Sequence, residues 1–176
     1  PQRSANSSFP QSNVVEIRKA VIPVAGLGIR FLPATRSVPK VMLPLFDVPI
    51  LHYSVKEAVS AGIEHIVIVV SDRQEAGKTY FENDPSMVAA LEQKGQQNLL
   101  DEMESISTMA EISYITQKQP EGLGHAVLST KSLIGNEPFA LLLPDDVIWS
   151  EPPTIRKLAD LYKDWGLSLI HISEPT

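Results

Sequence analysis

One glycine-rich, basic segment stands out as a place where chemistry could occur. It runs from Ala25 to Lys40 and reads Ala-Gly-Leu-Gly-Ile-Arg-Phe-Leu-Pro-Ala-Thr-Arg-Ser-Val-Pro-Lys. No acidic residue lies between Glu16 and Asp47, although the whole chain carries a net charge of −6. Glycine lets the backbone approach a ligand and turn its N–H groups inward, and Arg and Lys supply positive charge for phosphate oxygens. The segment predicts a polyphosphate cradle; the alternative is a basic surface loop with turn glycines.

The spacing of this segment differs from the two commonest phosphate-binding loops. A dinucleotide fingerprint would need a third glycine where Phe31 stands, and a P-loop would end in Gly-Lys-Ser or Gly-Lys-Thr. A near match to a P-loop occurs elsewhere, from Asp72 to Thr79, but Asp72 replaces its first glycine and would set a carboxylate beside the phosphates. A P-loop NTPase that uses Lys78 and Thr79, with Asp145 as its acidic strand end, remains an alternative.

A second candidate group lies where a predicted strand passes into a predicted helix. Gln117 ends the strand, and Gly122 and Gly124 lie in the turn before the helix. A glutamine amide offers both a donor and an acceptor, which suits the edge of a base ring, and the glycines would let backbone groups reach that base. An ordinary strand–turn–helix with flexible glycines is the alternative. His125 could contact the ligand or simply occupy the first helical turn.

The third candidate group is a pair of carboxylates, Asp145 and Asp146, that follows the apolar run Leu141–Leu143 and Pro144. An aspartate at the end of a buried strand is a common Mg²⁺ ligand, because that ion prefers hard oxygen donors and retains water. The same residue could instead cap the following turn.

Five short apolar runs, several of them nearly continuous in Val, Ile and Leu, are typical of buried strands. They are Lys19–Ala25, His65–Val70, Ile112–Thr116, Phe139–Leu143 and Leu167–Ile172. Helical spacing predicts helices around 51–59, 128–133 and 155–162, and one or two surface helices between Asp84 and Ala110. This alternation predicts an α/β fold with a doubly wound, mostly parallel, Rossmann-like sheet. Ligands bind beyond the carboxyl ends of the strands in such sheets, where all three candidate groups lie.

Composition limits the classes of protein that fit. The 176 residues are 43% hydrophobic and 20% charged, which is typical of a globular domain. No apolar run approaches the ~20 residues of a membrane span, and the negative net charge argues against nucleic acid as a partner. The absence of cysteine suits a cytoplasmic location. The polar segment 1–13 has no apolar core, so we expect a disordered tail rather than a signal peptide.

The motif Gly-Leu-Gly-x-Arg-x-Leu-Pro-Ala-Thr-x-x-x-Pro-Lys-x-Met-Leu-Pro, within 25–45, resembles the signature of bacterial UTP–glucose-1-phosphate uridylyltransferases, which are sugar nucleotidyltransferases. Gly-Leu-Gly-His-Ala-Val, at 122–127, resembles the uracil-binding turn of that family. The resemblance implies UTP and glucose 1-phosphate as substrates and Mg²⁺ as cofactor. The site residues it implies are Ala25, Gly26, Leu27 and Gly28 for the nucleotide, Arg30 and Lys40 for the triphosphate and catalysis, Gln117 and Gly122 for the base, and Asp145 for the metal.

The sequence departs from the family pattern at a few positions. Ile29 stands where the family usually has Thr, Val41 where it has Glu, and Arg36 where it has Lys. We expect these departures to affect the catalytic rate more than the fold. Related thymidylyl and adenylyl enzymes share parts of the motif, so a thymidylyl- or adenylyl-transferring relative and a nucleotide-binding regulatory module remain alternatives.

The resemblance covers roughly residues 14–166, the nucleotide-binding part of a nucleotidyltransferase domain. Full-length relatives continue for about as much again and commonly form homo-oligomers. We therefore expect a truncated version of the fold that binds nucleotide weakly and does not turn over alone. Residues 167–176 would be either a truncated start of the next strand or a non-native tail.

Overall fold

The computed structural model describes residues 15–26, 28–71, 76–119 and 121–170. Several sequence-based expectations fall outside these ranges: the tail 1–13, the nucleotide-loop residue Leu27, the start of the P-loop-like segment at Asp72, and the last part of 167–176. None of the described helices has the length and apolarity needed to span a membrane.

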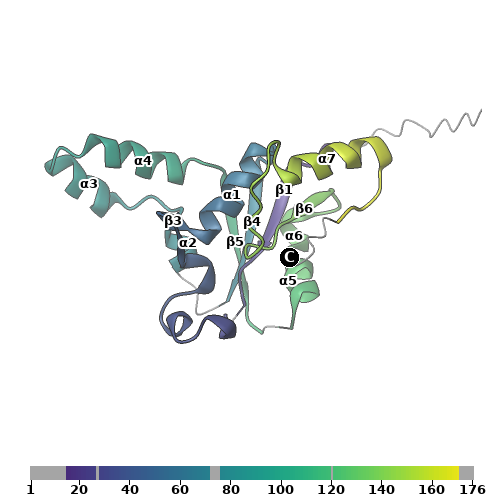
Figure 1. Cartoon of the computed structure of the whole chain (residues 1–176), viewed down its shortest axis with the longest axis horizontal. Helices are drawn as coiled ribbons and strands as arrows, with labels where there is room; N and C mark the ends of the chain where they lie inside the picture. The colour runs from purple at the N-terminus through teal and green to yellow at the C-terminus, as the bar shows by residue number, and fades with distance from the viewer. Residues whose placement is uncertain (1–14, 27, 72–75, 120, 171–176) are drawn as a thin grey trace, which may run out of the picture.

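A four-stranded parallel sheet forms the centre of the fold (Figure 1). Its strands are β1 (Lys19–Pro23), β4 (His65–Ser71), β5 (Glu111–Gln117) and β6 (Phe139–Leu141), in the order β5-β4-β1-β6. Four of the five predicted strands are thus confirmed, with ends shifted by one or two residues. The fifth prediction was wrong for 167–170, which form no strand, and residues 171 and 172 are not described.

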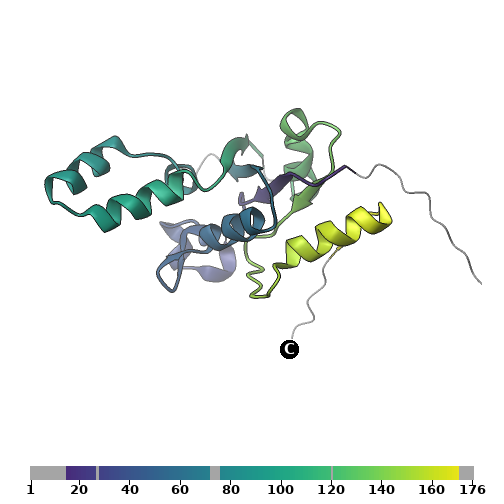
Figure 2. The ribbon, with the colours of Figure 1, turned by 90° about the horizontal axis from the view of Figure 1, so that it is seen from above.

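Helices cover both faces of this sheet, as predicted for a doubly wound fold (Figure 2). On one face lie α1 (Ile50–Ser60) and α7 (Thr154–Trp165), and on the other lie α5 (Leu123–Ser129) and α6 (Lys131–Ile134). The residues of each strand pack alternately on the two faces, because successive side chains of a strand point to opposite sides of the sheet. In β1, Ile22 packs towards α1, whereas Val21 packs towards α5 and α6.

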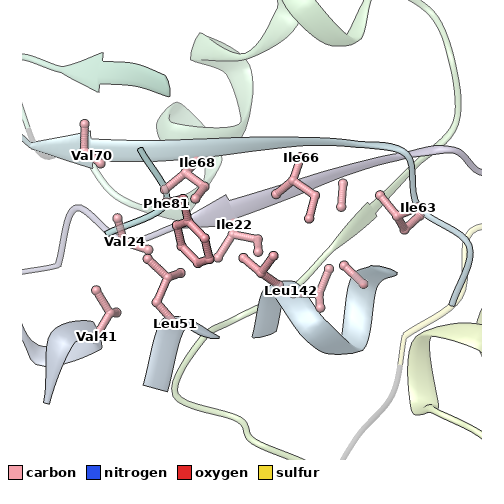
Figure 3. Close-up of a cluster of buried hydrophobic side chains, with 13 residues drawn as sticks. Ile22, Val24, Val41, Leu51, Ile63, Ile66, Ile68, Val70, Phe81 and Leu142 are labelled. Atoms are coloured by element: carbon pink, nitrogen blue, oxygen red, sulfur yellow. The ribbon is translucent and has the colours of Figure 1, made fainter. Parts of the chain in front are cut away.

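The larger core lies between the sheet and α1 (Figure 3). It combines alternate residues of β1 and β4 with the apolar stripe of α1. The members labelled in Figure 3 are Ile22, Val24, Val41, Leu51, Ile63, Ile66, Ile68, Val70, Phe81 and Leu142. The residue after α1, Ala61, leads to Gly62 with a φ of 92°, so the chain turns into β4 through a glycine.

The segment between β4 and β5 forms α2 (Ala76–Thr79) and then two surface helices, α3 (Pro85–Gln93) and α4 (Gln97–Ser107). Helices α3 and α4 contain no buried residue and extend as a hairpin away from the sheet (Figure 1). The prediction of one or two inserted surface helices is confirmed. The single helix predicted around 128–133 was wrong, because the chain breaks at Thr130 into α5 and α6.

The order of the strands creates a switch point beside β1. The chain passes from β1 to β4 and β5 on one side and then returns to place β6 on the other side of β1. The carboxyl ends of β1 and β6 therefore lie side by side where the strand order reverses, which is the usual place for a ligand in such sheets. The glycine-rich segment follows β1, and Asp145 follows β6, so both candidate groups lie at this crevice.

Candidate functional site

The glycine-rich segment after β1 folds into a compact loop of three short 3-10 turns, Ile29–Phe31, Ala34–Arg36 and Lys40–Met42. Gly28 starts the first turn with φ 62° and ψ 31°, the left-handed conformation that favours glycine. The Thr35 hydroxyl donates a 2.8 Å hydrogen bond to the Gly28 carbonyl and closes the loop on itself. A side chain at Gly28 would meet Thr35 at 3.0 Å and Lys40 at 3.1 Å, so the tight loop requires glycine there.

A cavity of about 460 Å³ lies against this loop. Its lining combines loop backbone with three charged side chains from the two sides of the switch point. The lining residues that could bind a nucleotide are Gly26, Gly28, Arg30, Lys40 and Asp145. Ala25, which the sequence also assigned to the nucleotide site, is buried behind the loop with 7% of its surface exposed.

Lys40 and Asp145 meet across the cavity although 105 residues separate them in the chain. The Lys40 ammonium donates a 2.7 Å hydrogen bond to Oδ2 of Asp145, and the Lys40 Nζ lies 4.9 Å from the centroid of the Phe31 ring. The hydrogen bond from Lys40 holds the pKa of the Asp145 carboxyl below its ordinary value, and the charge of Arg30 adds to the effect. Asp145 is therefore ionised at neutral pH, with Lys40 as its partner.

The candidate base-reading residues lie at the same edge of the sheet but do not line this cavity. Gln117 ends β5, which is separated from β1 by β4, a distance of about 10 Å at the usual strand spacing. The Gln117 side chain is buried, and its Nε2 lies 2.7 Å from Nδ1 of His125 in the first turn of α5. Gly122 precedes α5 with a φ of 93°, again a conformation that favours glycine.

Residues 19–170 match the protein family described as Nucleotidyl transferase. This chain belongs to the nucleotidyl transferase family. It is 46% identical over 159 residues to UTP–glucose-1-phosphate uridylyltransferases of Staphylococcus epidermidis and Bacillus subtilis, covering 90% of this chain and 55% and 54% of those proteins. Among solved structures, it is similar to the UTP-bound UGPase from Acinetobacter baumannii, with a TM-score of 0.81 and 40% identity over 85% of this chain. A UDP-glucose pyrophosphorylase complexed with UDP-glucose has a TM-score of 0.73 and 38% identity.

The chain spans about half the length of the curated relatives that it matches. The matched region includes all the described strands and helices of the sheet, together with the loop after β1 and the turn before α5. The resemblance inferred from the two motifs is thus confirmed at the level of the family, and so is the mostly parallel nucleotidyltransferase fold.

The donor set at the cavity suits a magnesium ion that a bound nucleotide helps to hold. Asp145 supplies one carboxylate, and its side chain is 56% exposed. Among the described residues, no group of three or more His, Cys, Asp or Glu side chains could enclose a metal ion. Mg²⁺ is commonly held by one or two carboxylates together with substrate phosphates, so a single carboxylate beside the predicted phosphate cradle fits that ion.

Two of the departures from the family pattern have different structural surroundings. Val41 is 5% exposed and packs in the large core, where it contacts the apolar cluster rather than solvent (Figure 3). Ile29 is 67% exposed and lines the cavity, so the position at which the family usually has a hydroxyl presents an apolar side chain to the ligand space.

The described part of the segment gives the P-loop alternative no support. Gly77 and Lys78 lie in α2, a helix of only four residues that ends at Thr79. The Lys78 carbonyl accepts a 3.0 Å hydrogen bond from the Tyr114 hydroxyl, and Lys78 does not line the cavity that contains Asp145.

Sequence reasoning missed two residues that shape the site, Thr35 and Phe31. Thr35 closes the loop through its bond to Gly28, and Phe31 lies beside the Lys40 ammonium. Neither contact has a signal in the spacing of residue types, because both depend on the path of the three short turns.

Proposed function

We propose that this chain is the nucleotide-binding part of an enzyme that transfers the uridylyl group from UTP to glucose 1-phosphate and forms UDP-glucose and pyrophosphate. The observation that carries the proposal is the convergence of Arg30, Lys40 and Asp145 with Gly26 and Gly28 around one cavity at the switch point. The names of the relatives, which specify UTP and glucose 1-phosphate, support the choice of substrates.

In this proposal the residues of the chain act by position and charge. The backbone of the glycine-rich loop and the Arg30 guanidinium bind the triphosphate and stabilise the charge that builds up at the α-phosphorus as the sugar phosphate oxygen attacks in line. The Lys40 ammonium leaves Asp145 and binds a phosphate group of the nucleotide, which frees the Asp145 carboxylate. Gln117 and Gly122 contact the uracil ring.

Mg²⁺ held by Asp145 and the phosphates would neutralise charge on the reacting phosphate groups. We expect the complete enzyme to be a homo-oligomer. A cytoplasmic place for the reaction is consistent with the absence of cysteine.

Thermal unfolding of the whole chain with Mg²⁺ and UTP, dTTP or ATP tests the proposal. A ligand at a hundred times its dissociation constant stabilises a protein by about 2.7 kcal/mol, which raises the melting temperature measurably. We expect UTP to raise it most and Arg30→Ala to abolish the rise. Arg36→Ala is the matched control, because Arg36 lies in the same loop but does not line the cavity.

A stronger rise with dTTP or ATP would replace the uridylyl assignment with a thymidylyl or adenylyl one. An equal loss of the UTP-induced rise in melting temperature in both arginine variants would show that UTP binding depends only on the general positive charge of the loop. A cooperative transition that no nucleotide moves would contradict nucleotide binding by this chain.

A further inference from the structure

The buried side chain of Gln117 is in contact with His125 at the end of β5. The Gln117 residue is only 5% exposed, and among the described residues its side chain hydrogen-bonds to His125 alone, with Nε2 2.7 Å from Nδ1. No buried side-chain nitrogen or oxygen in the described part of the chain lacks a partner. The side-chain oxygen of Gln117, Oε1, has no partner among the described residues and is therefore open to solvent or to a ligand.

The chemistry of the two groups fixes the direction of this hydrogen bond. An amide nitrogen can only donate, so Nδ1 of His125 must accept, and the neutral ring must carry its proton on Nε2. The Nε2 side of the ring faces Glu121, whose Oε2 lies 3.9 Å away. His125 thus holds one N–H of the Gln117 amide and leaves the carbonyl oxygen and the second N–H for another partner.

The orientation of this amide decides which pyrimidine it can pair with. Uracil presents an N–H donor at N3 beside carbonyl acceptors, whereas cytosine presents an acceptor at N3 beside an amino donor. An amide that offers its oxygen to N3 and its N–H to the neighbouring carbonyl matches uracil, and the same amide turned by 180° matches cytosine. A contact that prevents the amide from rotating by 180° therefore also selects the base.

We propose that His125 is a positioning residue that fixes the Gln117 amide with its oxygen outward and so makes the site prefer uracil to cytosine. The inference rests on the proposed function, since Gln117 must be the base-reading residue. It goes beyond that function by assigning base selectivity to a side chain that contacts Gln117 rather than the nucleotide. Thymine has the same N3–H edge as uracil, so His125 does not separate UTP from dTTP.

The first test needs no nucleotide. Nitrogen-15 NMR of the free chain should show that the neutral His125 ring carries its proton on Nε2 and not on Nδ1. It should also show a Gln117 side-chain amide resonance that moves towards the position of a solvated amide in His125→Ala. A protonated Nδ1 in the neutral ring, or a Gln117 amide resonance that is unchanged in His125→Ala, would overturn the inference.

The second test compares the dissociation constants of UTP, dTTP and CTP. We expect His125→Ala to lower the preference for UTP over CTP about tenfold, the usual effect of one hydrogen bond. His125→Asp supplies an acceptor in place of Nδ1 and should retain most of the preference, whereas His125→Lys supplies only donors and should shift it towards CTP. The affinity for dTTP should change in parallel with that for UTP.

His65→Ala is the matched control, because it removes another half-buried histidine, bonded to Ser113 at the opposite end of β4 and β5, and should leave the UTP-to-CTP ratio unchanged. A ratio that His125→Ala does not alter would overturn the inference while leaving the proposed function intact. Failure of the wild-type chain to bind any nucleotide would instead contradict the proposed function, and the NMR test would then decide the role of His125.

Discussion

At the scale of single residues, Gly28 is the position at which the loop conformation depends most directly on residue type. We expect Gly28→Ala to destabilise the chain by about 1–3 kcal/mol, because a side chain is strained at positive φ. The added carbon would also approach the side chains of Thr35 and Lys40 to 3.0–3.1 Å, so Lys40 would have to move. Thermal unfolding measures the stability, and UTP titration measures the expected loss of affinity.

Gly26→Ala is the control for this prediction. Gly26 lies two residues earlier in the same loop, but its φ is not in the left-handed region and an added Cβ would meet no atom within 4 Å. The alanine at Gly26 should therefore leave the melting temperature close to that of the wild-type chain. Equal destabilisation by the two substitutions would mean that the left-handed conformation of Gly28 does not hold the loop together.

Residue types and the predicted sheet indicated part of the arrangement of the candidate site. The meeting of Lys40 with Asp145 was within reach of sequence reasoning, because the loops after β1 and β6 were both expected at the carboxyl edge of one parallel sheet. The contact between Gln117 and His125 was not, since an eight-residue spacing across a strand, a turn and a helix start has no fixed geometry. A pattern of residue types does not determine side-chain orientation in such a turn.

At the scale of elements, the hairpin of α3 and α4 should open far more readily than the sheet. Neither helix contains a buried residue, although Asp84 caps α3 by accepting hydrogen bonds from the Ser86 and Met87 backbone N–H groups. Strand β4 has five consecutive buried residues. Local opening costs least where few apolar contacts are lost, so amide hydrogen exchange should be fastest in α3 and α4 and slowest in β4.

Helix α1 is the internal control for this exchange measurement, because it has the same length as α4, 11 residues, but buries Leu51, Ser54, Val55 and Ala58. Its amides should exchange more slowly than those of α4 at every pH tested. Protection of α3 and α4 equal to that of α1 would contradict an exposed hairpin and would indicate that another surface, such as a second copy of the chain, covers it.

Elements with a strong sequence pattern were predicted correctly, and features with a weak pattern were missed. Continuous apolar runs identified β1 and β4 because both are covered on two faces. The break between α5 and α6 was missed because Thr130, 1% exposed, turns its hydroxyl to the Val127 carbonyl, a local bond that the apolar spacing does not indicate. The run Leu167–Ile170 is apolar and yet forms no strand, which shows that composition without a neighbouring strand does not suffice.

At the scale of the whole molecule, several large apolar side chains after the edge strand β6 and in α7 are exposed. Strand β6 pairs with β1 and, among the described strands, with no other. Exposed apolar residues near it in the sequence and in α7 are Leu141, Leu143, Val147, Trp149, Leu161 and Trp165. Parallel sheets are normally covered, and contiguous exposed apolar surface commonly marks a contact with another part of a protein. The relatives are nearly twice as long as the region they share with this chain, so their remaining part is the natural candidate to cover this surface.

The two tryptophans make this expectation measurable. Trp149 is 91% exposed and Trp165 is 68% exposed, and the chain has no other tryptophan, so the emission of the chain alone should be that of solvated indole. Adding the part of the Bacillus subtilis relative that this chain does not match should shift the emission to shorter wavelength as the indoles leave water. Trp149→Phe and Trp165→Phe, examined separately, show which side chain is covered. An unrelated protein of similar size is the control, and binding of the relative's remaining part without any shift would mean that it covers a different surface.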